Sequence, residues 1–152
     1  MARPLLAALL AMLLIACGGG GPVKRIFPPE ARLQEFRLQD SYAHLQLRVQ
    51  SFSTVPSVLQ AYTLTLEIAG TQAARFEGNA ATTVLPRAVE IIAITTPLEA
   101  VAVARTRAAL ADGTALRYRL HGTITVEPNG RAHPIDYSSA LSPVPGLENV
   151  LR

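Results

Sequence analysis

A long stretch of alternating apolar and polar residues, 116–127, constrains the fold of this chain more than any other feature. Its apolar positions are Leu116, Tyr118, Leu120, Ile124 and Val126. A period of two places one set of side chains on each face of a β-strand, so this stretch predicts the longest strand of the chain. Gly122 falls on the apolar face, where a glycine is typical of a bulge, a bend or the close approach of another backbone.

Turn signals and further alternation extend the β pattern in both directions. Residues 127–130, Glu-Pro-Asn-Gly, predict a tight turn, and an antiparallel partner strand should return through Ile135, Tyr137 and Ala140. The alternation of residues 45–50 and 62–68 predicts two earlier strands. A short strand is expected around 73–76, between Gly70 and Gly78, and the apolar stretch 89–95 is typical of a central strand.

One segment departs from the β pattern. Thr96, Pro97 and Glu99 match an N-cap, a first helical position and the third residue of a capping box, which predicts a helix that ends at Ala111 before Gly113. About six or seven short strands with a single helix favour an all-β fold, a small antiparallel β-sandwich with one inserted helix. A barrel is the alternative architecture.

The amino-terminal residues predict export and lipid attachment. Arg3 precedes an apolar run from Leu5 to Ile15, about eleven residues, whereas a bilayer-spanning helix needs roughly 20. The run ends in the lipobox Leu14-Ile15-Ala16-Cys17, so we expect a signal peptide at 1–16 and acylation of Cys17. The alternative is an ordinary secretory signal with an incidental cysteine. A flexible tether (17–30), a sandwich domain (31–145) and a C-terminal tail (146–152) complete the predicted organisation.

Composition narrows the classes of function. Cys17 is the only cysteine, so disulfides, a cysteine nucleophile and thiolate metal sites are excluded once it carries lipid. The formal net charge is +3, but the arginines are spread along strands with acids between them, which argues against a nucleic-acid partner. Gly18 is not the Asp that commonly retains lipoproteins in the inner membrane. We therefore expect a protein of the bacterial envelope, anchored in the outer membrane and facing the periplasm.

No catalytic or metal-binding pattern is found in the sequence. The three histidines are far apart, and none has a partner at metal-ligand spacing; they are His44, His121 and His133. We interpret each as solvated or locally bonded, with His44 and His121 on polar strand faces. No serine lies in a nucleophile motif, and the carboxylates lack the stacking aromatics of a sugar-cleaving cleft. We expect no enzyme activity, no catalytic residues, no metal and no cofactor, and the binding residues stay unknown.

The long strand and its partner together resemble a known family. The carrying residues are 118–126 (YRLHGTITV), then Arg131 in the turn region, 134–137 (PIDY) and 140–143 (ALSP). This arrangement is similar to the C-terminal hairpin of the late embryogenesis abundant type 2 proteins, which carry the water-stress and hypersensitive-response domain. Residues 45–53 and 64–70 correspond to earlier strands of that family, although Gln50-Ser51-Phe52 stands where the family commonly has Asn-Pro-Asn.

The resemblance implies a fibronectin-III-like or immunoglobulin-like β-sandwich with a helix, no catalytic residues, and a link to desiccation and other stress. Bacterial members are often small lipoproteins. The first hypothesis for function is therefore a membrane-anchored, non-enzymatic envelope lipoprotein of the water-stress type, which protects or binds envelope components. The second is an accessory module that presents an exposed sheet edge to an envelope protein partner.

Overall fold

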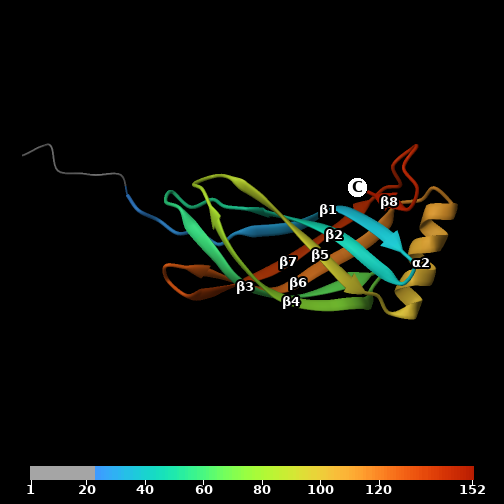
Figure 1. Cartoon of the computed structure of the whole chain (residues 1–152), viewed down its shortest axis with the longest axis horizontal. Coiled ribbons are helices and arrows are strands. Elements are labelled where there is room, and N and C mark those ends of the chain that lie inside the picture. The colour runs from blue at the N-terminus through green and yellow to red at the C-terminus, as the bar shows by residue number, and fades with distance from the viewer. Residues whose placement is uncertain (1–22) are drawn as a thin grey trace, which may run out of the picture.

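The computed structural model describes residues 23–152, and Figure 1 shows two layers of long strands with one helix across an end. The predicted signal peptide, Cys17 and the first part of the predicted tether lie outside the described residues. The elements in chain order are β1 (Glu30–Gln39), β2 (Tyr42–Gln50), β3 (Ser57–Ile68), β4 (Thr71–Val84), β5 (Val89–Pro97), α2 (Ala100–Ala111), β6 (Leu116–Glu127), β7 (Arg131–Leu141) and β8 (Val150–Leu151).

Two antiparallel sheets of four strands face one another. The first has the strand order β5-β2-β1-β8 and the second has the order β4-β3-β6-β7. The predicted β-sandwich with one helix inserted between strands is confirmed. Helix α2 connects the two sheets, because β5 belongs to one and β6 to the other.

The core forms between the inner faces of the sheets, where the apolar positions of each alternating strand meet. The core cluster extends from Ala31 to Leu151. Its largest fully buried side chains are those of Phe36, Leu45, Leu47, Leu64, Leu66, Ile68, Leu120, Ile124 and Leu151. Fully burying a side chain of this size contributes about 1.5 to 3 kcal/mol. Residues 31–151 thus supply the interior of the domain.

Helix α2 closes one end of the sandwich through two arginines. Nη1 of Arg105 donates to the carbonyl oxygens of Ile68 and Ala69, at 3.2 and 2.8 Å, in the turn between β3 and β4. Nη2 of Arg107 donates to the carbonyl oxygen of Asp40, at 3.0 Å, in the turn between β1 and β2. The helix therefore binds one turn of each sheet, and the chain enters from the opposite end (Figure 1).

The start of the helix differs from the prediction. Thr96 and Pro97 end β5, where they pair with Ala43 and Tyr42 of β2. The helix begins at Ala100, with Glu99 as its N-cap and no side-chain capping bond. The predicted capping box is wrong because strand pairing extends through Thr96. Pro97 is tolerated there because β5 is an edge strand.

Two strands also have a different place or length from those expected. Strand β5 is an edge strand, not a central one, and its outward-facing Val89 and Ile91 are exposed. Strand β4 does not stop at Gly78 but runs from Thr71 to Val84. Gly78 pairs with Tyr62 of β3, whose phenol ring lies where a Cβ would be, so the cross-strand tyrosine covers the glycine and the strand continues.

The domain extends beyond both of its predicted boundaries. Val150 and Leu151 form β8 and are buried, with Leu151 paired to Phe36 of β1, so residues 146–152 are not a tail outside the domain. In the predicted tether, the backbone N–H of Arg25 donates to Oγ1 of Thr54 at 2.9 Å. Strand β1 begins one residue before the predicted boundary, at Glu30.

Candidate functional site

A cleft of about 290 Å³ lies at one open side of the sandwich. Strand β8 is short and meets β1 only at Phe36 and Arg37, so among the described residues the first half of β1 has no strand on that side. Strand β7 is the last strand of the opposite sheet. The cleft opens between these two edges, and the residues that matter for its chemistry are Arg32, Arg48, Tyr118, Tyr137 and Arg152.

Two of the arginines lie directly opposite each other in the sheet. Arg32 of β1 pairs with Arg48 of β2, and like charges at directly opposed positions destabilise a sheet. Within residues 23–152 neither arginine forms an ion pair with a carboxylate. A hydrogen bond to Tyr137 raises the pKa of Arg32, and Nη1 of Arg48 donates to Oε1 of Gln50 at 2.9 Å. The hydrogen-bond partners of these two positive charges are thus neutral side chains.

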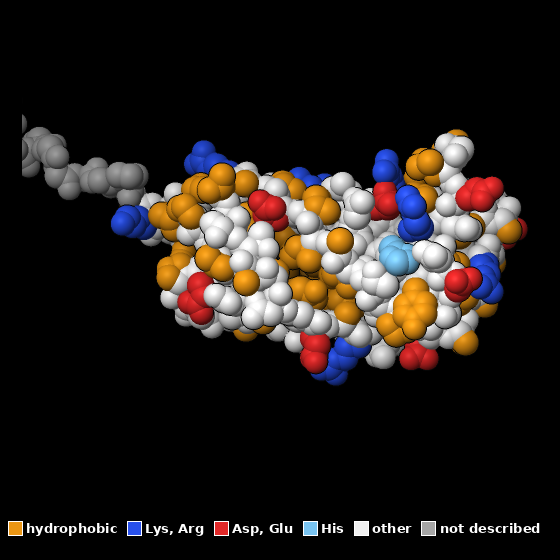
Figure 2. Space-filling view, viewed as in Figure 1, with side chains coloured by type: hydrophobic (Ala, Val, Ile, Leu, Met, Phe, Trp, Pro, Cys, Tyr) orange, Lys and Arg blue, Asp and Glu red, His pale blue; other side chains and the backbone are white. Residues whose placement is uncertain are grey.

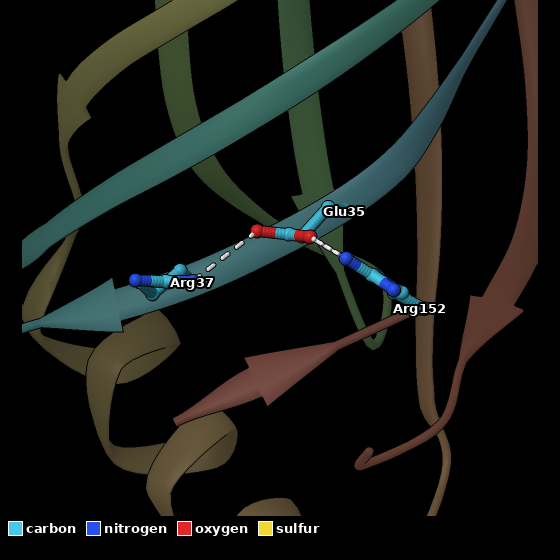
Figure 3. A network of polar contacts seen from close by, with 3 residues as sticks. All are labelled: Glu35, Arg37 and Arg152. Carbon is cyan, nitrogen blue, oxygen red and sulfur yellow. Dashed lines mark hydrogen bonds and ion pairs between the residues drawn. The ribbon is translucent and has the colours of Figure 1, made fainter. Parts of the chain in front are cut away.

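The third arginine belongs to a network around a buried carboxylate (Figure 3). Nε and Nη2 of Arg152 donate to Oε2 of Glu35 at 2.9 and 2.6 Å. Nη2 of Arg37 lies 3.7 Å from Oε1 of Glu35, whose side chain is 7% exposed. A buried carboxylate needs such partners. Glu35 thus pairs with Arg37 and Arg152 and forms no ion pair with Arg32 or Arg48.

Tyrosines form the wall of the cleft on the side of the second sheet. The Tyr118 hydroxyl accepts a hydrogen bond from the backbone N–H of Leu33 at 3.2 Å, which joins β6 to the free edge of β1. Burial raises the pKa of Tyr118. The ring of Tyr137 is tilted against that of Tyr118, with centroids 6.5 Å apart. Guanidinium groups beside a phenol suit a carboxylate or phosphate group, so the cleft is a candidate anion-binding site.

The histidines do not contribute to this cleft. Nδ1 of His44 lies 3.0 Å from Oγ1 of Thr95, and Nε2 of His121 lies 3.2 Å from Oε1 of Glu67; both are on outer faces, as predicted. His133 is different, because its side chain is buried and Nε2 has no hydrogen-bond partner. Burial, followed by the charge of Arg131, lowers the pKa of His133. The prediction that His133 is solvated or locally bonded is wrong.

Paired charges occupy the outer face of the second sheet. Nε and Nη2 of Arg119 donate to the two carboxylate oxygens of Asp136, both at 2.8 Å. This pairing raises the pKa of Arg119 and lowers the pKa of Asp136. Across β6 and β7, His121 is the register partner of Asp136. Arg119 and Asp136 therefore satisfy each other's charge.

Residues 23–152 contain no group of three or more His, Cys, Asp or Glu side chains placed to hold a metal ion. No helix among them has the length and apolar character needed to cross a bilayer. The predicted lipid-attachment residue, Cys17, is outside this range.

The arginine cleft is not visible along the sequence, because Arg32, Arg48 and Arg152 are distant in the chain. The one available signal is the strand pattern, because antiparallel pairing across the turn at 40–41 brings Arg32 opposite Arg48. That register depends on β1, and no unbroken alternation of apolar and polar residues predicts β1 as a strand.

Comparisons with known proteins give a likeness of fold. No family model matches the chain, and no curated protein matches it. A solution structure of an Arabidopsis thaliana protein aligns with a TM-score of 0.57 and 12% identity, over 88% of this chain and 94% of that one. A crystal structure of an Archaeoglobus fulgidus protein aligns with a TM-score of 0.46 and 17% identity, over 81% and 99% of the two chains. The X-ray structure of a Northeast Structural Genomics Consortium target, SoR45, aligns with a TM-score of 0.45 and 11% identity, over 81% of this chain and 92% of that one. The Arabidopsis structure therefore has a similar β-sandwich fold.

Proposed function

We propose that the protein is a non-enzymatic lipoprotein of the bacterial envelope that uses the arginine cleft to bind anionic groups of envelope components. The observation that carries the binding role is the opposed pair Arg32 and Arg48, neither of which forms an ion pair with a carboxylate in residues 23–152. A sheet that keeps two like charges opposite each other is stabilised when an anion binds both. Carboxylates and phosphates are the anions that guanidinium groups bind best.

The family resemblance supports placing this binding role in water stress. The residues that resemble the late embryogenesis abundant type 2 domain, 118–126, 134–137 and 140–143, form most of the β6–β7 hairpin and its end. Among them, Tyr118, Tyr137, Ala140 and Leu141 line the cleft. We propose that the protein is a member of the water-stress type and that its clients are envelope components exposed to drying.

The lipid anchor proposed at Cys17 fixes the location. Two or more acyl chains hold a protein stably on one leaflet, whereas one chain holds it marginally. Residue 18 is glycine, so we propose the outer membrane, with the sandwich in the periplasm. Replacing Cys17 by Ser should remove the protein from membranes that have been washed with high salt. The wash removes weak charge attraction. A Cys17→Ser protein that sediments with washed membranes as completely as the unchanged protein would refute the anchor.

Client binding can be tested by crosslinking in intact cells followed by affinity purification. The test variant is Arg32→Ala/Arg48→Ala, and the matched control is Arg75→Ala/Arg117→Ala, which removes the same charge from exposed strand positions. We expect the crosslinked component to disappear only in the first variant. Equal recovery of the crosslinked component with both variants would refute the binding role of the cleft. It would not affect the anchor proposal.

An accessory module that presents a sheet edge is the second candidate, and strand β5 favours it. This strand pairs only with β2, and its outward-facing Ile91 is 43% exposed. Open apolar edges accept an added strand from another protein, and a charge on the edge prevents this. If this candidate is correct, Ile91→Lys should abolish recovery of one protein partner, while Arg32→Ala/Arg48→Ala should leave it unchanged.

A further inference from the structure

Exposed apolar side chains gather at the end of the sandwich where the chain enters. Figure 2 shows hydrophobic and basic side chains together beside the point at which the amino-terminal trace leaves the domain. Leu85 is 59% exposed, Val23 63% and Phe52 44%. We call this end the apolar tip, and its exposed large hydrophobic residues are Val23, Phe27, Phe52, Leu85 and Val89.

Backbone contacts hold the segments of the apolar tip together. The N–H of Phe27 donates to Oγ of Ser53 at 3.1 Å. The N–H of Ser51 donates to the carbonyl oxygen of Ala88 at 2.9 Å, and the N–H of Ala88 to that of Leu85 at 3.1 Å. Three segments from different parts of the chain are therefore tied into one surface at a fixed position relative to the core.

The three segments of the apolar tip carry positive charge only, although the β6–β7 turn at the same end of the sandwich adds Glu127 and Arg131. The segments are 23–29, 51–56 and 84–89, and they contain three exposed basic residues, Lys24, Arg25 and Arg87, but no acidic residue. Apolar side chains surrounded by lysine and arginine match the interface of a bilayer that contains anionic lipid. Each basic residue near such a surface contributes attraction, and the apolar groups enter the boundary between headgroups and acyl chains.

The covalent chain brings this end close to the membrane. Five residues lie between Cys17 and Val23, and the six steps from one to the other span at most about 20 to 22 Å when the chain is fully extended. If acyl chains on Cys17 lie in the bilayer, Val23 lies within that distance of the surface. Helix α2 lies at the opposite end of the sandwich (Figure 1).

We propose that the apolar tip is a membrane-contact surface, which rests on an anionic phospholipid bilayer with Phe27, Phe52 and Leu85 in the interface. This inference rests on the proposed lipid anchor for the distance, and on the described residues for the surface. The contact orients the sandwich with α2 directed away from the bilayer. A protein seated on the apolar tip is the competing outcome, and the test below separates it from the membrane.

The absence of tryptophan from the chain allows one introduced tryptophan to report its own surroundings. The protein for the test runs from Cys17 to Arg152, which contains the whole core. Its only thiol, Cys17, is coupled to a maleimide phospholipid in vesicles that contain phosphatidylglycerol and brominated acyl chains. Leu85→Trp and Phe52→Trp place the reporter at the apolar tip. Val101→Trp, at an exposed position of α2, is the matched control at the far end.

We expect brominated lipid to reduce the emission of both tip variants by about twofold or more, because interfacial residues lie about 5 to 10 Å into the boundary region. The Val101→Trp emission should not change. Equal emission from tip and control variants with and without bromine would overturn the proposal. Because the coupling is chemical, this result does not depend on whether cells acylate Cys17, which the fractionation of Cys17→Ser tests separately.

The basic residues are tested with uncoupled Cys17→Ser protein of the same length and sedimented anionic vesicles. Lys24→Gln/Arg87→Gln should lower the partition coefficient about 10- to 30-fold at low salt, given the attraction per basic residue near such a surface. Arg75→Gln/Arg117→Gln, with the same loss of charge, should have little effect. Equal losses in the two variants would mean that the apolar tip is not the membrane-contact surface. A tip that crosslinks to a protein in cells while its tryptophans stay unquenched would assign it to a protein partner instead and refute the membrane contact.

Discussion

Replacing Gly122 by Ala tests a close backbone approach in the second sheet. Gly122 lies in β6 between Leu64 of β3 and Ile135 of β7, and its φ is +145°. An added Cβ would overlap the carbonyl oxygen of Thr63 and lie 3.0 Å from the Cα of Leu64. These are backbone atoms of a central strand, so they can move only by disturbing the hydrogen-bonded ladder.

The expected loss of stability combines three contributions. A non-glycine residue in a sparsely populated backbone region costs about 1 to 3 kcal/mol. Forcing the strands to shift costs about 1 to 3 kcal/mol more. Alanine returns about 0.4 to 1 kcal/mol by lowering the entropy of the unfolded chain. We therefore expect Gly122→Ala to lower the free energy of unfolding by about 1 to 5.6 kcal/mol, out of a total of about 5 to 15 kcal/mol for a typical domain.

The assay is urea unfolding followed by circular dichroism, and Gly70→Ala is the matched control. Gly70 has a φ of +76°, but nothing lies within 4 Å of its added Cβ. The control therefore includes backbone strain without overlap and should cost about 1 to 2 kcal/mol. If the two variants have equal midpoints, the close approach of β3 to Gly122 is not what requires glycine. An unchanged midpoint for Gly122→Ala would mean that the strand register itself is wrong.

Three further predictions concern groups that the fold buries. Tyr118→Phe should lower the free energy of unfolding by about 1 to 3 kcal/mol, because the backbone N–H of Leu33 loses its acceptor; a loss as small as that of an exposed tyrosine would contradict this. Arg152→Ala should cost about 1 to 3 kcal/mol, because buried Glu35 loses two hydrogen bonds, and adding Glu35→Gln should restore part of it in a double-mutant cycle. Burial lowers the pKa of His133 in the folded state, so the unfolded chain binds the proton more readily and stability should fall as pH drops below about 6.5. His133→Gln should remove this part of the pH dependence, and identical slopes in both proteins between pH 7 and 5 would count against it.

The sequence pattern predicts a strand where the alternation of apolar and polar residues is unbroken. It misses a strand where that alternation is interrupted. Strand β6 was predicted over the residues it occupies, because its apolar positions keep a period of two. Strand β1 was missed because its register shifts between Leu33 and Glu35. The shift puts buried Leu33 and Phe36 three residues apart, and a bulge of this kind hides a strand from any period-two pattern.

Whether a strand lies in the centre or at the edge of a sheet could not be predicted from the hydrophobicity of its residues. Apolar residues on both faces of 89–95 suggested a central strand, yet β5 is at an edge with Ile91 exposed. The predicted start of the helix was wrong for a related reason. Thr96 has the right residue type for an N-cap, but its hydrogen-bonding strand partner is in β2, which is about 50 residues earlier in the sequence.

Local pattern by itself determined the β class of this protein, the β6–β7 hairpin, the presence of one helix and the predicted lipobox, since each depends on residues that are neighbours in the chain. The tertiary structure alone decided the arginine cleft, the pairing of Glu35 with Arg152, the buried position of His133 and the apolar tip. Arg152 and Glu35 are 117 residues apart, and only sheet order and register bring such residues together. Contacts of this range are set by the packing of the two sheets, and no spacing along the sequence encodes them.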